Sequence, residues 1–199
     1  HRIDGVEIVF QLAPETEAPA EMHMFYPGLR ALNLAENATH TLHNILTLRG
    51  AQIRDAKAWA DALSESLRLF GSRTDTLIAS HFWPRWGQAK IIDFLSAQRD
   101  MYEYLHDQSV RMMNTGSTGP EIAERLQLPP ALASRWFNQG YYGTLSHDSK
   151  AVYQRYLGWY DGNPATLNAL PPSETPTANS GVSGASTRRI AASIAPISA

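Results

Sequence analysis

Hydrophobic residues in the first part of the chain occur at every second position or in short runs, separated by polar residues, glycine and proline. The alternation is clearest at Val6, Ile8 and Phe10. Successive side chains of a strand point to opposite faces, so this pattern predicts short strands joined by turns. The expected strands cover residues 6–11, 22–26, 31–35 and 76–80.

A helical period appears downstream of Asp55. Apolar residues between Ala58 and Phe70 are spaced three or four positions apart, which places them on one stripe of a helix. Asp55 can cap the start of this helix, and Gly71 can end it. Three strands, a helix and a strand in this order agree with half of a layered α/β sandwich, ending at about residue 81.

Only helical patterns follow residue 87. Thr118 and Glu121 have the spacing of a capping box with proline in the first turn, and Ser146 can cap the last helix. The expected helices cover about 91–113, 119–126, 129–137 and the stretch from Ser146 to Tyr160. From residue 171 onward the chain has no aromatic residue and is rich in Ser, Thr, Pro and Gly, so we expect disorder there.

The charge of the chain is nearly balanced, with 17 Lys and Arg against 19 Asp and Glu and a formal net charge of −2. This balance predicts no broad cationic surface, and therefore no nucleic-acid partner. No apolar run approaches the roughly 18 residues of a membrane-spanning helix, so no membrane span is expected. The chain has no cysteine, so a metal site in it has to use histidines and carboxylates.

Side chains with metal-binding chemistry stand directly after two of the predicted strands. Glu36 follows the run at 31–35 and His81 follows the run at 76–80, so two strand ends can bring an oxygen and a nitrogen ligand to one place. A borderline-soft ion such as zinc accepts this mixture. On these residues alone the alternative is a solvated or hydrogen-bonded Glu and His, which is the more common state of such side chains.

Four segments carry a family resemblance: residues 15–22 (ETEAPAEM), 35–44 (AENATHTLHN), 48–51 (LRGA) and 80–87 (SHFWPRWG). Together they resemble the linear alkylsulfatases of the metallo-β-lactamase superfamily, in the same order along the chain. The likeness extends from about the first residue to Asn168. It implies that Glu17, Glu36 and His81 are ligands of a centre with two zinc ions.

The same resemblance implies that Asn44 and Arg49 grip the sulfate group of a substrate. The Arg guanidinium presents a planar fork of donors that suits a tetrahedral oxyanion, and the Asn amide adds a directional donor. His40 and His43 can orient the metal ligands or the anion from behind. Hydrogen bonding within a polar loop is an equally weighted alternative for both histidines.

The resemblance also predicts the organisation and activity of the chain. It implies a partial metallo-β-lactamase-like domain at 1–87, an all-helical dimerisation domain at 88–170 and a disordered tail at 171–199, in an enzyme that hydrolyses linear alkyl sulfates. The family's main zinc motif, His-x-His-x-Asp-His, is absent. Zinc generally takes four donors per ion, so three ligands are too few for two ions. We therefore expect the carboxyl-terminal portion of a homodimeric alkylsulfatase that is inactive by itself.

Residues 118–139 admit a second interpretation, a helix-turn-helix that binds DNA or another protein. A DNA-binding helix of this kind carries basic and amide side chains that reach phosphates and bases. Here it offers mainly Arg135, Asn138 and Gln139 beside two aromatic residues, so helix packing or dimerisation is favoured. A third interpretation, in which the Trp and Tyr clusters form a surface for alkyl chains, competes with ordinary core packing.

Overall fold

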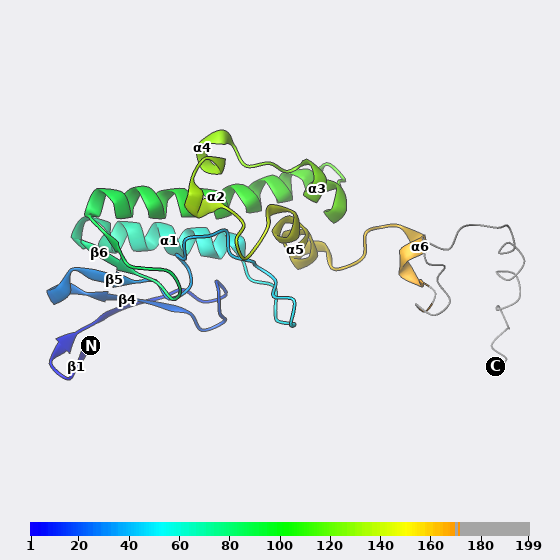
Figure 1. Ribbon diagram of the computed structural model, residues 1–199. Coiled ribbons are helices and arrows are strands. Elements are labelled where there is room, and N and C mark those ends of the chain that lie inside the picture. The colour runs from blue at the N-terminus through cyan, green and yellow to red at the C-terminus, as the bar shows by residue number, and fades with distance from the viewer. Residues whose placement is uncertain (170, 172–199) are drawn as a thin grey trace, which may run out of the picture. The chain divides into compact units, whose positions relative to one another are not determined.

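The computed structural model describes residues 1–169 and 171 (Figure 1). The chain divides into two compact units, His1–Gly162 and the segment from Asn163 onward. Among its described residues the second unit contains the short helix α6 (Pro164–Leu167), which Asn163 caps. The disorder expected at 171–199 falls outside the described residues except at Pro171. The domain boundary expected at residue 87 stays a prediction.

A five-stranded mixed sheet forms one part of the first unit. Its strands, in spatial order, are β3 (Val9–Leu12), β4 (Met22–Tyr26), β5 (Ala31–Asn33), β6 (Thr76–Ile78) and β7 (Arg85–Trp86). β5 and β6 are parallel, and the other neighbours are antiparallel. The register places Phe25, Leu32 and Leu77 in one buried row across three strands. This row forms part of the apolar face that the helices cover.

The single strand expected at residues 6–11 is divided in two. Its first part, β2 (Val6–Glu7), pairs with β1 (Arg2–Ile3) in a separate hairpin. The turn residues Asp4 and Gly5 both have positive φ, which is the conformation of a tight two-residue hairpin turn. The chain therefore folds back on its own start, and only the second part of the expected strand joins the large sheet as β3.

Helix α1 (Ala56–Phe70) connects the parallel strands β5 and β6, since parallel neighbours need a crossover connection. Asp55 caps it as predicted, because its side chain accepts hydrogen bonds from two backbone N–H groups of the first turn. The long helix α2 (Gln88–Asn114) packs along α1. Both helices lie along one side of the sheet (Figure 1).

One apolar core joins the sheet to the helices. The Trp59 ring on α1 stacks on the Tyr102 ring on α2, with 4.7 Å between the ring centroids. The same cluster of buried side chains includes Phe137 and Val152, which follow α2 in the chain. The expected order, a mixed α/β region followed by a helical region, is confirmed.

The helices after α2 are shorter: α3 (Gly119–Arg125), α4 (Pro130–Ala133) and α5 (Leu145–Leu157). α3 begins with the predicted capping box of Thr118 and Glu121. α5 differs from the prediction at both ends. Thr144, not Ser146, caps it, and Gly158 ends it in a positive-φ conformation that stops the helix before Tyr160.

The prediction of a continuous helix at residues 129–137 is wrong. α4 ends at Ala133, and a separate 3-10 turn covers Trp136–Asn138. Arg135 between them is extended and forms two hydrogen bonds of 2.9 Å with Asp93 of α2. This bidentate ion pair joins the segment to α2, and buried bonds from Gln98 Nε2 of α2 to Phe137 O at 2.8 Å and to Asn138 Oδ1 at 2.9 Å hold the 3-10 turn. The second helix of the proposed helix-turn-helix is consequently a single turn.

Replacing Asp55 with Ala is expected to lower the free energy of unfolding by about 1–2 kcal/mol, because the first turn of α1 loses its cap and Arg155 loses a carboxylate partner. Urea unfolding followed by circular dichroism measures the change. Asp61→Ala in the same helix is the control. Asp61 is 62% exposed and pairs with Lys57 one turn away, so its removal should change the free energy of unfolding by less than about 0.5 kcal/mol. Equal effects of the two substitutions would contradict the capping role.

Candidate metal and anion site

The parallel pairing of β5 and β6 brings Glu36 and His81 together, because the loops that follow parallel strands leave the same edge of a sheet. Beyond the strands, Ser80 N still donates to Ala35 O. His81 Nε2 and Glu36 Oε1 are in direct contact. The juxtaposition expected from the two strand ends is therefore present.

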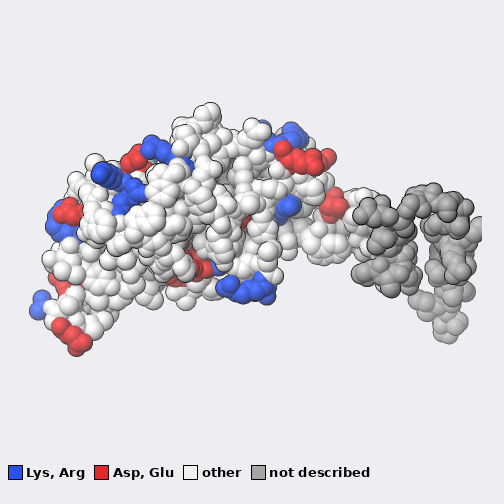
Figure 2. Space-filling model, in the orientation of Figure 1, with Lys and Arg blue, Asp and Glu red and all other residues white. Residues whose placement is uncertain are grey.

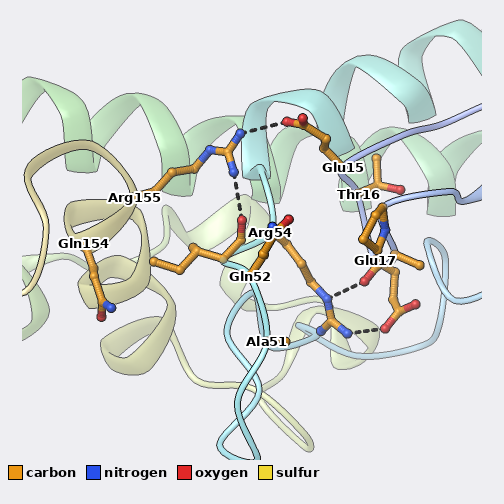
Figure 3. A pocket seen from close by; sticks show the side chains of 11 residues that line it. Glu15, Thr16, Glu17, Ala51, Gln52, Arg54, Gln154 and Arg155 are labelled. Carbon is orange, nitrogen blue, oxygen red and sulfur yellow. Dashed lines mark hydrogen bonds and ion pairs between the residues drawn. The ribbon is translucent and has the colours of Figure 1, made fainter.

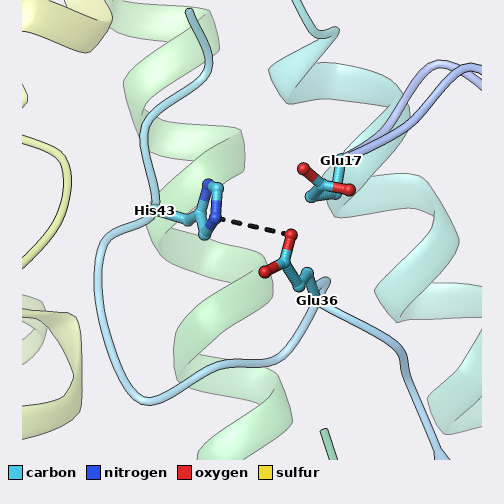
Figure 4. Close-up of side chains that lie close together, drawn as sticks. All are labelled: Glu17, Glu36 and His43. Atoms are coloured by element: carbon cyan, nitrogen blue, oxygen red, sulfur yellow. Dashed lines mark ion pairs between the residues drawn. The ribbon is translucent and has the colours of Figure 1, made fainter. Parts of the chain in front are cut away.

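Glu17 and His43 lie close to Glu36 (Figure 4). One ligand atom from each of these three residues lies within 4.8 Å of the other two, and His43 Nε2 is 4.0 Å from Glu36 Oε2. His43, expected only behind the ligands, lies among the carboxylates. His81 touches the group through Glu36, and its side chain is 69% exposed. We call Glu17, Glu36, His43 and His81 the donor cluster.

The two carboxylates of the donor cluster titrate as a pair. Burial raises the pKa of Glu17, and its hydrogen bond to Glu36 adds to this, while Arg54 opposes it. Burial also pushes the pKa of Glu36 upward, but its hydrogen bonds to Glu17 and His81 and the nearby His43 outweigh burial, so the pKa of Glu36 is lowered. Two carboxylates this close oppose each other's ionisation, so a divalent cation between Glu17 and Glu36 would relieve their repulsion.

His43 is suited to act as a neutral nitrogen donor. Burial lowers the pKa of His43, and the charge of Arg54 acts in the same direction. Its Nδ1 lies 2.8 Å from the carbonyl oxygen of Asn44, so Nδ1–H can donate there while Nε2 faces Glu36. Histidine ligands of metals are commonly oriented by such a bond from the other ring nitrogen. Two carboxylates together with imidazole nitrogens form a donor set that fits zinc.

Arg54, which the sequence patterns did not single out, contacts the carboxylate of Glu17 in the donor cluster (Figure 3). Its guanidinium also donates to Asn44 O at 2.8 Å and to Asn44 Oδ1 at 3.0 Å. Because Asn44 Oδ1 is occupied, the amide NH₂ of Asn44 remains to face a ligand. A positive charge at the N-terminus of a helix is unfavourable, because the helix dipole has its positive end there. The position of Arg54 directly before α1 therefore indicated that an acidic side chain should pair with it.

A buried chain of hydrogen bonds links the loops that carry the two carboxylates. Asn37 Oδ1 accepts from Glu17 N at 3.2 Å, and Asn37 Nδ2 lies 2.9 Å from Thr16 Oγ1 and 2.7 Å from His23 Nε2. His23 Nδ1 lies 2.8 Å from Ser66 Oγ on α1. Burial lowers the pKa of His23 to about 4, so the ring is neutral and passes hydrogen bonds on to α1. Helix α1 thereby fixes Glu17 relative to Glu36.

Three residues in or next to the donor cluster have left-handed backbone conformations. φ is +48° at Ala35, +63° at His81 and +61° at Phe82. Such conformations are uncommon for residues other than glycine, and they concentrate at functional sites. Ala35 directly precedes Glu36, so the backbone turns sharply where both Glu36 and His81 leave the sheet edge.

His40 lies in an aromatic stack outside the donor cluster. Its ring is nearly parallel to that of Trp136, with 5.4 Å between the centroids, and stacks on Phe94 at 4.7 Å. Arg85 Nε donates to His40 Nε2 at 3.3 Å. Burial and the charge of Arg85 lower the pKa of His40 to about 4, so the ring is neutral. These contacts tie the loop of His40 to α2 and β7.

Asn44 and Arg49 line the same hollow, which has a volume of about 430 Å³. A second hollow of about 350 Å³ contains Glu36, His43 and His81 of the donor cluster. Tyr142 lines both hollows, so they adjoin at this residue. Asn44 is buried and held by Arg54, whereas Arg49 is exposed. A hollow lined by an amide and a guanidinium group therefore adjoins the hollow of the donor cluster.

Comparisons with known proteins identify the family. Residues 118–193 match a family model described as alkyl sulfatase dimerisation. The chain is 55% identical over 170 residues to the alkyl/aryl-sulfatase BDS1 of Saccharomyces cerevisiae, and the match covers 85% of this chain and 26% of that protein. The chain belongs to the alkylsulfatase family.

Two further relatives support this membership. The linear primary-alkylsulfatase of a Pseudomonas species is 50% identical over 174 residues, covering 87% of this alkylsulfatase-family chain and 26% of the relative. The solved structure of the stereoselective inverting sec-alkylsulfatase Pisa1 from a Pseudomonas species matches with a TM-score of 0.86 and 50% identity, over 87% of this chain and 28% of that one. The chain spans about a quarter of the length of the curated relatives it matches.

The distribution of charged side chains on the surface is consistent with the nearly balanced charge of the chain. Figure 2 shows basic side chains in small separate groups on the visible face, several of them beside acidic ones. The dimerisation match includes residues 118–139, the segment considered as a helix-turn-helix, and α4 within it is a single turn. Within the described part of the chain, no helix has the length and apolarity needed to cross a membrane.

Proposed function

We propose that this chain carries part of the metal centre and the sulfate-binding groups of an enzyme that hydrolyses alkyl sulfates to an alcohol and inorganic sulfate. The observation that carries the proposal is the donor cluster beside the hollow lined by Asn44 and Arg49. The substrate class comes from the relatives, which are named alkyl or aryl sulfatases.

Zinc is the proposed metal, with Glu17, Glu36 and His81 as ligands and His43 as a further nitrogen donor. Bound zinc would lower the pKa of a water to about 7 and so supply hydroxide near neutral pH. Two zinc ions require about eight donors, more than the donor cluster contains. We therefore propose that the two-zinc centre also uses residues outside this chain, and that the chain alone binds zinc without hydrolysing sulfate esters.

Other residues of this chain are proposed to bind the sulfate group and to position the metal ligands. Arg54 turns the NH₂ group of Asn44 outward, and the exposed fork of Arg49 lies on the same hollow, so both can donate to sulfate oxygens. Asn37 keeps Glu17 and Glu36 at a fixed separation. Tyr142 stands between the sulfate hollow and the hollow of the donor cluster.

The helical region is proposed to form a homodimer. Its segment matches the dimerisation model, and large apolar side chains at the end of α5 and just beyond it are more than half exposed. They are Tyr156, Leu157 and Trp159. A symmetric contact between two copies would bury the same patch on each.

Arg49→Lys is expected to weaken the binding of inorganic sulfate and hexyl sulfate about tenfold, because Lys lacks the planar fork that pairs with two oxygens. Isothermal titration calorimetry of the zinc-loaded chain measures the change, and zinc content should stay the same. The control is Arg111→Lys, on the exposed face of α2. If Arg49→Lys and Arg111→Lys bind sulfate as tightly as the wild type, Arg49 does not hold the anion.

A further inference from the structure

The loop of residues 41–46, which carries His43 and Asn44, contains neither helix nor strand. Its backbone partners come from far along the chain. Leu42 N donates to Gln139 O at 2.9 Å, and Gly143 N donates to Leu42 O at 3.0 Å. The segment that joins the 3-10 turn to α5 therefore holds the loop through main-chain hydrogen bonds on both sides of Leu42.

Side chains of the helical region hold the next residues of the loop. Tyr102 Oη accepts a hydrogen bond from His43 N at 3.1 Å, and Asp148 Oδ1 accepts one from Ile45 N at 3.1 Å. His147 Nε2 lies 2.6 Å from Leu46 O. Tyr102 and Asp148 are almost completely buried. Their bonds are thus shielded from competing water, and an unpaired loop N–H there would be destabilising.

Gly143 permits the close approach of the two segments. A Cβ atom at this position would lie 2.6 Å from Asn44 N and 2.8 Å from the carbonyl carbon of His43. Both atoms belong to the backbone, so a side chain at position 143 has to displace the loop itself. The neighbouring Tyr142 ring and the His43 ring are nearly perpendicular, with 4.8 Å between the centroids.

We infer that residues 139–148, together with Tyr102, form a clamp that sets the positions of His43 and Asn44 in the site. This inference rests on the proposed function for the roles of His43 and Asn44. The clamp residues 139–148 lie within the match to the dimerisation model, so that region has a second role as a positioning element. Substitutions of clamp residues should then alter the binding of metal and sulfate, although these residues themselves contact neither the metal nor the sulfate.

Hydrogen exchange of the loop tests the clamp directly. Gly143→Ala should make the amides of residues 42–45 exchange about tenfold faster or more, because the loop is pushed off its partners. Gly28→Ala is the matched control, since a Cβ at Gly28 meets no atom within 4 Å and its φ is not in the left-handed region. Mass spectrometry of peptides from the whole chain gives both rates. Wild-type exchange of the loop in Gly143→Ala would overturn the clamp.

A second set of variants removes single bonds and keeps the test valid if Gly143→Ala fails to fold. Tyr102→Phe and Asp148→Leu each remove one acceptor, whereas Asp148→Asn keeps the Oδ1 acceptor for Ile45 N. Fast loop exchange is expected in the first two variants, with rescue in Asp148→Asn. Equal exchange rates for Asp148→Leu and Asp148→Asn would show that Asp148 only fills space, which would overturn its part in the clamp.

Cobalt(II) connects the clamp to the site, because its visible absorption spectrum reports the geometry of bound nitrogen and oxygen ligands. We expect the spectrum to change in Tyr102→Phe and Asp148→Leu and to stay as in the wild type in Asp148→Asn and Gly28→Ala. A wild-type spectrum in a variant whose loop exchanges rapidly would overturn the positioning role. A wild-type chain that binds no cobalt but has a protected loop would contradict the proposed function while the exchange data still support the clamp.

Discussion

Glu36→Gln is expected to weaken zinc binding by the chain more than about 100-fold, since even residues that only orient metal ligands account for roughly 10- to 100-fold in affinity. Glu36 is the central member of the donor cluster. It contacts His81, interacts with Glu17 and lies 4.0 Å from His43. Gln preserves the shape of the side chain but removes the negative charge that attracts the cation.

Isothermal titration calorimetry with Zn²⁺, followed by elemental analysis after dialysis, measures this loss. His81→Ala should also reduce zinc occupancy, because it removes a nitrogen donor that contacts Glu36. Glu65→Gln is the matched control. Glu65 is on the surface of α1 and pairs with Arg68, away from the donor cluster. Full zinc occupancy in Glu36→Gln or His81→Ala, with Glu65→Gln behaving as the wild type, would remove those residues from the metal centre.

The elements with strong local signals could be predicted from the sequence. Asp55 precedes a regular apolar stripe and caps α1 as expected, and the convergence of Glu36 and His81 follows from two strand ends that become parallel neighbours. The continuous helix predicted at residues 129–137 is absent because of tertiary contacts. The apolar spacing there favoured a helix, but the segment bonds to side chains of α2 that are distant in sequence, Asp93 and Gln98, and no local pattern reports these contacts.

The composition of the donor cluster was harder to predict, because it depends on contacts between distant segments. His43 lies in a loop whose conformation is fixed by Tyr102 and by residues 139–148, and no local pattern around His43 reports those partners. Arg54 contacts Glu17, which lies 37 residues away in the chain, as well as Asn44. Sequence motifs could therefore identify the candidate ligands but not the groups that position them.

The pH dependence of stability provides the second large expected effect, and it centres on His23. Burial lowers the pKa of His23 from 6.5 to about 4 in the folded chain. Below pH 6.5 the unfolded chain binds a proton that the folded chain does not. The stabilisation is therefore complete above pH 6.5 and is lost as the pH falls towards 4. At 1.36 kcal/mol per unit of pKa, the loss from this residue is about 3 kcal/mol.

Asp148 acts with the opposite sign. Burial raises the pKa of Asp148 to about 8 from its ordinary value of 3.8. The folded chain then holds a proton that the unfolded chain releases, so this residue adds stability as the pH falls from 8 towards 3.8. The pH dependence of the free energy of unfolding of the wild type contains the contributions of both His23 and Asp148. Variants of each residue separate the two contributions.

His23→Gln isolates the contribution of His23, because Gln does not titrate while its amide can still bond within the network of Asn37 and Ser66. Urea unfolding of both proteins at pH 7, 6, 5 and 4.5 gives the difference in free energy at each pH. We expect His23→Gln to be the less stable protein at pH 7 and to recover relative to the wild type by roughly 2 kcal/mol at pH 4.5. Asp148→Asn should change the slope in the opposite direction. Parallel curves for His23→Gln and the wild type would contradict a buried, neutral His23, since a histidine that titrates equally in both states leaves the difference independent of pH.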